Sequence, residues 1–211
     1  MLVKDIMTER VIAIDPTMPI GDVYALMEQR NIRHFPIVRN DDLIGIVSDR
    51  DIRSVGSELP SSKQGVTLQD PVERIMSAPP ITTYAADPVE ESAHILRERK
   101  IGAMPVVDEQ DRLIGIVTGI DFLEALIKMT GVEGATSRLE VEVDNRPGSL
   151  AALSEAISRR GVNIASVLST RKDTDTLSFV LRVGTIDGRG LANELREEGF
   201  DVVWPTETKL V

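Results

Sequence analysis

The sequence predicts an α+β protein in which two copies of a small repeat pack as a pseudo-twofold pair and a ferredoxin-like domain follows. The first observation is an internal repeat: residues 3–52 align with residues 72–122, and Pro36 recurs as Pro105. Duplicated units of this length bury their faces against each other. The second observation is a change of pattern after residue 137, where alternating apolar and polar residues open a βαββαβ order.

Each copy of the repeat reads as strand, helix, strand, hairpin turn, strand and helix. In the first copy we expect a short strand at residues 11–14 and a helix that has Pro19 in its first turn. In the second copy Asp87 is the expected N-cap and Pro88 the first helical residue. The apolar residues of the first helix fall on one face, which we expect in the core.

Each copy ends in an apolar strand that leads into a hydroxyl residue and, three positions later, an aspartate. These pairs are Ser48 with Asp51 and Thr118 with Asp121. The spacing predicts the hydroxyl at a helix N-cap and the aspartate at the third helical position. Two interpretations stay open: the corner binds a phosphate and a diol, or it is an acidic capping box that satisfies only the helix's own donors.

The C-terminal segment carries its own strand and helix pattern. Leu139, Val141 and Val143 alternate with polar residues, as in a half-buried strand. A turn at residues 144–150 leads into a helix that stops at Gly161. We expect further strands at residues 164–170, 177–183 and 202–204 and a second helix at residues 191–198, which completes a ferredoxin-like order.

These patterns set the expected domain boundaries. We expect a first repeat at residues 1–56, a linker loop at 57–71, a second repeat at 72–130, a linker at 131–137, a ferredoxin-like domain at 138–205 and a tail at 206–211. The first linker is polar and contains proline, serine and glycine. It is either a plain connection or a loop that closes over a bound ligand.

The composition narrows the classes of function. The formal net charge is −10 and aromatic residues make up 3% of the chain, so neither the basic surface nor the stacking platforms of a nucleic-acid-binding protein are expected. No apolar run approaches the roughly 20 residues that span a bilayer, and the first residues lack an apolar signal core. We therefore expect a cytoplasmic protein with no nucleic-acid or membrane partner.

The sequence also lacks the residue patterns of catalysis. There is no cysteine, which excludes disulfides, thiol nucleophiles and iron–sulfur clusters. It has no phosphate-loop lysine and no nucleophile beside a base. Neither His34 nor His94 has a second ligand at metal spacing. We expect no catalytic residue, no metal and no catalytic cofactor, and the chain is not predicted to be an enzyme.

The duplicated strands resemble those of a known family. Phe-Pro-Ile-Val at residues 35–38 and Met-Pro-Val-Val at residues 104–107 are each followed by Leu-Ile-Gly-Ile-Val and then Ser/Thr-x-x-Asp. Residues 1–130 are in this way similar to a tandem cystathionine-β-synthase (CBS) domain pair, or Bateman module. The resemblance implies an adenosine-containing ligand, with Asp on the ribose hydroxyls, Ser or Thr on phosphate, and adenine between apolar strand residues. The implied nucleotide-binding residues are Ser48, Arg50, Asp51, Thr118, Asp121, His34, Pro36, Ile37, Pro105, Val106, Ile12, Ala13, Ile81 and Thr82.

The two copies differ within the corner itself. Gly119 and Ile120 stand where the first copy has Asp49 and Arg50. Arg50 either reaches a phosphate or pairs with a neighbouring aspartate on the surface. The second copy lacks this cation, so the two sites should differ in affinity or ligand, and S-adenosylmethionine suits the second site better than a phosphate.

The C-terminal domain resembles an ACT domain. The match rests on Asp-x-x-Pro-Gly-x-Leu at residues 144–150 and Gly-Val-Asn-Ile at residues 161–164. The resemblance implies domains that pair side by side and bind an amino acid at the pairing interface, with its carboxylate on N–H groups at the start of the first helix. The implied amino-acid-binding residues are Asp144, Pro147, Gly148, Ser149, Leu150, Asn163 and Ile164, the last two from a partner subunit. The alternatives are that Pro147 and Gly148 serve only the turn and that the fold serves only pairing.

The order of domains resembles CBS–ACT regulatory proteins of the acetoin-utilisation type. The resemblance implies a non-catalytic sensor that binds AMP, ADP, ATP or S-adenosylmethionine as a regulatory ligand. It also implies a homodimer formed through both kinds of domain, and a regulated partner protein that the sequence does not identify. The alternative is a ligand-free dimerisation or scaffold subunit that regulates a partner enzyme.

Overall fold

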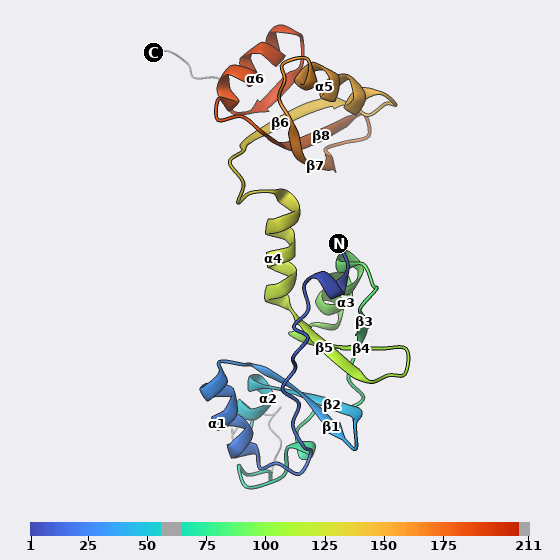
Figure 1. The fold of residues 1–211 in the computed structure, drawn as a ribbon, viewed down its shortest axis with the longest axis vertical. Coiled ribbons are helices and arrows are strands. Elements are labelled where there is room, and N and C mark those ends of the chain that lie inside the picture. The colour runs from blue at the N-terminus through green and yellow to red at the C-terminus, as the bar shows by residue number, and fades with distance from the viewer. Residues whose placement is uncertain (56–64, 207–211) are drawn as a thin grey trace. The chain divides into compact units, whose positions relative to one another are not determined.

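The computed structural model describes residues 1–55 and 65–206 (Figure 1). The chain divides into two compact units, residues 1–125 and residues 126–211. Residues 57–64 of the predicted linker lie outside the described part of the chain, and with them most of the segment proposed to close over a ligand. None of the helices in the described residues has the length and apolar character needed to span a bilayer.

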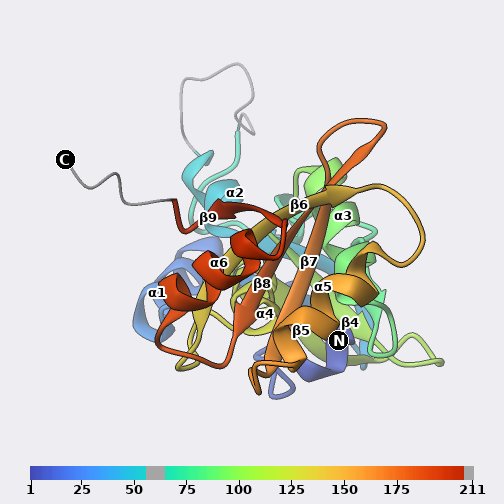
Figure 2. The same ribbon diagram turned by 90° about the horizontal axis from the view of Figure 1, so that it is seen from above.

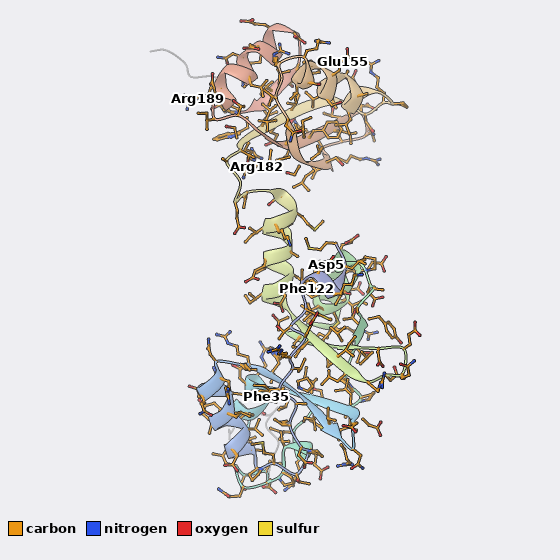
Figure 3. All side chains as sticks on the ribbon, in the orientation of Figure 1. Asp5, Phe35, Phe122, Glu155, Arg182 and Arg189 are labelled. Atoms are coloured by element: carbon orange, nitrogen blue, oxygen red, sulfur yellow. The ribbon has the colours of Figure 1, made fainter. Side chains whose placement is uncertain are left out.

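The first repeat forms a hairpin with two helices. Its elements are the 3-10 helix η1 (Val3–Asp5), α1 (Ile20–Arg30), β1 (His34–Arg39), β2 (Asp42–Ser48) and α2 (Asp49–Arg53). β1 and β2 are antiparallel, with Pro36 opposite Ile46. The core contains Phe35 at its centre (Figure 3) together with Ile20, Val23 and Val47, all fully buried.

The second repeat has the same plan with one more strand. Its elements are η2 (Val72–Arg74), β3 (Thr83–Tyr84), α3 (Val89–Arg99), β4 (Ala103–Val107), β5 (Leu113–Thr118) and α4 (Gly119–Thr130). β3 is parallel to β4, and β4 is antiparallel to β5. Met104, Val117 and Phe122 pack in its core.

The opening segment of each repeat packs on the other repeat. Val3 belongs to the core of the second repeat, and the segment that opens the second repeat packs in the same way on the first. Methionine side chains pack closely on glycines where these segments meet the hairpins. A Cβ on Gly45 would lie 2.6 Å from Sδ of Met76, and Gly115 and Met7 repeat this contact at 2.7 Å. The exchange confirms the predicted pseudo-twofold pair.

Three expectations for the repeats are wrong. Residues 11–14 form no strand apart from one bridge between Ile14 and Ile37. Pro19 and Pro88 are N-caps with extended backbone (ψ of 138° and 137°), and each helix begins one residue later. Asp87 does not cap the helix, because its Oδ2 closes the preceding turn by accepting from the N–H of Tyr84 at 2.8 Å.

The C-terminal domain confirms the ferredoxin-like prediction. Its elements are β6 (Ser137–Asp144), α5 (Ser149–Ser158), β7 (Ile164–Arg171), β8 (Thr176–Val183), α6 (Gly188–Glu197) and β9 (Asp201–Trp204). The four strands form an antiparallel sheet in the order β7-β8-β6-β9. Figures 1 and 2 show α5 and α6 on the same face of this sheet, where Leu139, Leu153, Leu181 and Leu195 are fully buried.

Candidate functional site

Both hydroxyl–aspartate pairs form hydrogen-bonded corners at the start of a helix. Oδ2 of Asp51 accepts from the N–H and the hydroxyl of Ser48, at 2.8 and 2.6 Å, and the N–H of Asp51 donates to Oγ of Ser48 at 3.3 Å. Oδ2 of Asp121 accepts from the N–H and hydroxyl of Thr118, at 2.6 and 2.7 Å. The predicted capping box is therefore complete at Ser48, whereas at Thr118 the half in which the aspartate accepts is formed. Among the described residues no group donates to the second oxygen, Oδ1, of either aspartate.

A cavity of about 590 Å³ opens beside the first corner. Its walls come from both repeats: residues 48–51, Arg33 and His34 from the first, and residues 77, 79–81 and 100–103 from the second. Five of the predicted nucleotide-binding residues line it together: His34, Ser48, Arg50, Asp51 and Ile81. Because one wall belongs to each repeat, this cavity exists only when the two copies pack together.

Other predicted residues do not line this cavity. Four of them are buried residues of β1 and β4, namely Pro36, Ile37, Pro105 and Val106. Thr118 and Asp121 form the second corner. Ile12 and Ala13 precede α1, and Thr82 precedes β3; none of these three is fully buried.

Three cations surround the cavity. Arg33 and Arg50 come from the first repeat and Lys100 from the second. Within residues 1–55 and 65–206 none of the three forms an ion pair. Of the two alternatives for Arg50, the ion pair with a neighbouring aspartate is absent from the described residues, and Asp49 pairs with Arg53 (3.0 Å). These three cations outnumber the two carboxylates of the same wall, Asp49 and Asp51, in a chain whose net charge is −10.

His34 sits where the two repeats meet. A Cβ on Gly102 would lie 2.6 Å from Nε2 of His34, so the imidazole occupies the space that a larger residue would fill. Burial lowers the pKa of His34 below its usual value, against the opposing effect of the Asp49 and Asp51 carboxylates, and Arg33 lowers it further. A neutral imidazole therefore faces the cavity near pH 7.

The sequence interpretation missed the wall contributed by Lys100 and Gly102. Lys100 ends α3 in the left-handed conformation (φ 54°), and Asn31 ends α1 in the same conformation (φ 52°) at the aligned position. The left-handed residue at the same position of both repeats indicates that an equivalent turn follows α1 and α3. This equivalence did not reveal that the side chain of Lys100 faces the other copy's corner.

The predicted amino-acid-binding residues lie at two places in the C-terminal domain. Asp144, Pro147, Gly148, Ser149 and Leu150 form the junction of β6 and α5, where the Ser149 hydroxyl donates to the carbonyl of Asp144 at 2.7 Å. Gly148 is the N-cap of α5, in the left-handed region at φ 94°. The carbonyl of Asn163 accepts from the N–H of Gly184 (2.8 Å), and Ile164 begins the edge strand β7.

The described part of the chain contains no group of three or more His, Cys, Asp and Glu side chains placed to bind a metal ion. What the geometry offers instead is hydrogen-bond acceptors, cations and apolar walls around one cavity. Such a combination of groups suits a small organic ligand that carries both hydroxyl and anionic groups.

The fold defines a duplicated α+β module with a cavity between its two copies, joined to a ferredoxin-like domain. Family models confirm both parts: the CBS domain matches residues 3–58 and 72–128, and the ACT domain matches residues 137–200. The chain belongs to the CBS-domain family and carries a C-terminal ACT domain.

Individual relatives share the CBS part. A CBS domain-containing protein of Dictyostelium discoideum is 33% identical over 134 residues, which are 61% of this chain and 92% of that protein. The CBS domain pair of protein MJ0100, solved with 5′-methylthioadenosine and S-adenosyl-L-methionine, is 29% identical with a TM-score of 0.53, covering 60% of this chain and 95% of that one. A Vibrio cholerae protein named for acetoin utilisation, AcuB, is 31% identical with a TM-score of 0.54, covering 63% and 95%.

Proposed function

We propose that this chain is a non-catalytic regulatory sensor that binds an adenosine-type ligand, such as AMP, ADP, ATP or S-adenosylmethionine, between its CBS repeats. The observation that carries the proposal is the cavity of about 590 Å³ between the Ser48–Asp51 corner of one repeat and residues 79–81 of the other. This volume is in the range of about 300–1,000 Å³ that small-molecule sites occupy. The MJ0100 pair, solved with two adenosine compounds, supports the ligand class.

Each wall of the cavity has a proposed role. Oδ1 of Asp51 accepts hydrogen bonds from the ribose hydroxyls, while Oδ2 keeps the corner closed. Arg33, Arg50 and Lys100 bind the phosphates. Ile81 contributes an apolar surface for the adenine. The ligand regulates by stabilising the arrangement of the two repeats in which these walls face each other.

We propose a second site at the Thr118–Asp121 corner, built by the same rules from the other copy. Ile12 and Ala13 take the place that Ile81 and Thr82 have in the first site, and Pro36, Ile37, Pro105 and Val106 hold the strands behind both sites. Gly119 and Ile120 supply no cation. A ligand without phosphate, such as S-adenosylmethionine, therefore suits this site.

The ACT domain is proposed to bind an amino acid and to pair with a second copy. Its carboxylate would lie on the N–H groups at residues 148–150, beside the turn that starts at Asp144, with Asn163 and Ile164 supplied by the second copy. The open edge of β7 supports side-by-side pairing. We propose that both ligands act on a regulated protein in the cytoplasm; an acetoin pathway is supported only by the likeness to AcuB.

Helix α4 supports a homodimer through the CBS part as well. Ile120, Leu123 and Ile127 are 63%, 56% and 41% exposed and follow one face of the helix. An apolar stripe of this kind in a soluble protein favours a protein contact, and we propose that a second copy covers it.

A ligand-free scaffold is the second candidate function, because the capping box leaves both corners hydrogen-bonded without any ligand. Isothermal titration with AMP, ADP, ATP and S-adenosylmethionine separates the two proposals. Saturable heat without turnover of the nucleotide supports the sensor. Absence of heat and of any thermal shift with all four compounds favours the scaffold.

A further inference from the structure

The ACT domain contains a second hollow, which no function considered so far uses. It has a volume of about 320 Å³ and lies between the start of β6, the loop before α6 and the end of β9. Its lining includes Arg138, Ile186, Arg189, Trp204 and Pro205. Ile186 is 95% exposed and Trp204, the single tryptophan of the chain, is 47% exposed. Both apolar side chains therefore face solvent at the same hollow.

This hollow is distinct from the proposed amino-acid site. Arg138 lies at the start of β6, whereas the proposed site follows Asp144 at the end of the same strand. At about 3.3 Å per residue, the two ends of the strand are roughly 20 Å apart. One small molecule cannot reach both places, so the hollow is a separate feature of the domain.

The walls of the hollow are held in place by the fold. Trp204 pairs with Glu140 across the sheet, and the carbonyl of Pro205 accepts a hydrogen bond from Arg196 of α6. A Cβ on Gly188 would lie 2.6 Å from Cβ of Ser137, so the start of α6 is packed tightly against the start of β6. The hollow is thus formed before any ligand arrives, which lowers the entropic cost of binding.

The chemistry of the lining selects a ligand class. The guanidinium of Arg138 lies over the indole of Trp204, 6.0 Å from the ring centroid, and one of its nitrogens donates to Glu140 at 2.7 Å. An arginine has five N–H donors, so others remain for a ligand. Arg189 adds a second guanidinium at the start of α6 (Figure 3). The carboxylate of Asp187 also lines the hollow, with its Oδ1 accepting from the N–H of Gly190, and the two guanidiniums of the lining outnumber it.

We propose that this hollow binds a small aromatic carboxylate. The aromatic ring would lie against the indole of Trp204 and the side chain of Ile186, and the carboxylate would accept hydrogen bonds from the arginines. The inference concerns a site apart from the nucleotide cavity. Its failure would leave the proposed sensor function intact, and the reverse also holds.

Trp204 is the only tryptophan, so its emission reports on this hollow in the full-length chain. Titration with sodium benzoate should give a saturable change in emission. Benzamide, which has the same ring without the charge, should bind about tenfold more weakly or worse. Ile186→Ser should weaken benzoate binding about threefold to tenfold through lost apolar contact, with an unchanged unfolding midpoint because the side chain is exposed. Ile95→Ser, an exposed isoleucine on α3, is the matched control.

Four results would overturn the proposal. They are no saturable change with benzoate, equal affinity for benzamide, equal affinity of Ile186→Ser and the unmodified protein, and a Trp204 emission that changes with protein concentration alone. The last result would mean that a second copy covers the hollow. A benzoate response that Ile186→Ser weakens and Ile95→Ser does not would support the site.

Discussion

Replacing Asp51 by alanine separates the two interpretations of the first corner. In the structure Oδ2 of Asp51 accepts two hydrogen bonds from Ser48, at 2.8 and 2.6 Å. Asp51 lines the cavity, and no group among the described residues donates to its Oδ1. The substitution therefore removes the carboxylate half of the capping box and, if the sensor proposal holds, the acceptor for the ribose. The two losses appear in different measurements.

The expected magnitudes differ enough to be resolved. Loss of a cap costs about 0.5–2 kcal/mol in the free energy of unfolding, which is a minor part of the roughly 5–15 kcal/mol that stabilises a folded domain. The melting temperature should fall by a few degrees and the protein should stay folded. Loss of a charged hydrogen-bond partner costs about 1.5–3 kcal/mol in binding, so the Kd for ATP should rise roughly 10- to 100-fold.

Asp87→Ala is the matched control. Oδ2 of Asp87 also accepts two hydrogen bonds, from the N–H of Tyr84 and the hydroxyl of Thr83, both at 2.8 Å, but Asp87 does not line the cavity. Both variants should lose stability, and only Asp51→Ala should lose affinity in calorimetric titration with ATP. If Asp51→Ala melts earlier and binds ATP as tightly as the unmodified protein, the corner is a capping box and nothing more.

Three further predictions concern the imidazole, the dimer and the ACT site. Burial lowers the pKa of His34 below 6.5 in the folded protein. As the pH falls, the imidazole is therefore protonated first in the unfolded chain. The contribution of His34 to the free energy of unfolding is complete above about pH 6.5 and is lost below it. Urea unfolding at several pH values should show a shallower decline in His34→Gln, and identical declines would contradict the assignment. Leu123→Glu should weaken self-association about tenfold or more in analytical ultracentrifugation, since it places a charge on the apolar stripe of α4. Lys128→Glu, on the same helix but off the stripe, should leave self-association unchanged. Equal effects of the two variants would exclude the stripe as the interface. Gly148→Val should weaken amino-acid binding and destabilise the ACT domain by about 1–2 kcal/mol, because its φ of 94° is strained for a β-branched residue. The control Gly199→Val, at φ 93°, should lose the same stability without losing amino-acid affinity. Unaltered amino-acid binding in Gly148→Val would exclude that site.

The fold could be predicted well because its signals are local or repeated. Alternating residues such as Leu139, Val141 and Val143 marked β6, and the recurrence of whole motifs marked the duplicated repeats. Residues 11–14 failed for a different reason: an apolar segment becomes a strand only if a neighbour pairs with it, and here a single bridge to Ile37 forms. The aligned segment of the second copy does form a short strand, because Thr83 and Tyr84 pair with β4.

Only one of the two walls of the candidate site could be predicted from the sequence. The corner at Ser48 and Asp51 is a local hydrogen-bonding pattern, so spacing alone located it. The facing wall, with Lys100 and Gly102, lies in the other repeat and comes near only because the repeats pack together. The sequence showed two copies without showing which part of one faces the corner of the other.

The duplication also explains why the first cavity should favour a ligand with phosphates. Two of its three cations stand where the other copy has a neutral residue: Arg50 aligns with Ile120 and Lys100 with Asn31, whereas Arg33 and its aligned residue Gly102 both line this same cavity. Asn31 and Lys100 share the same left-handed backbone at a helix end, so the exchange alters charge and leaves the geometry unchanged. Capping needs only the hydroxyl and the carboxylate, which both copies keep. A purely structural role for the corners gives no reason for Arg50 and Lys100 to stand where the other copy has Ile120 and Asn31. The proposed phosphate-binding role of the first corner accounts for these two cations, while Arg10, aligned with Pro79 of the cavity wall, is the reverse exchange.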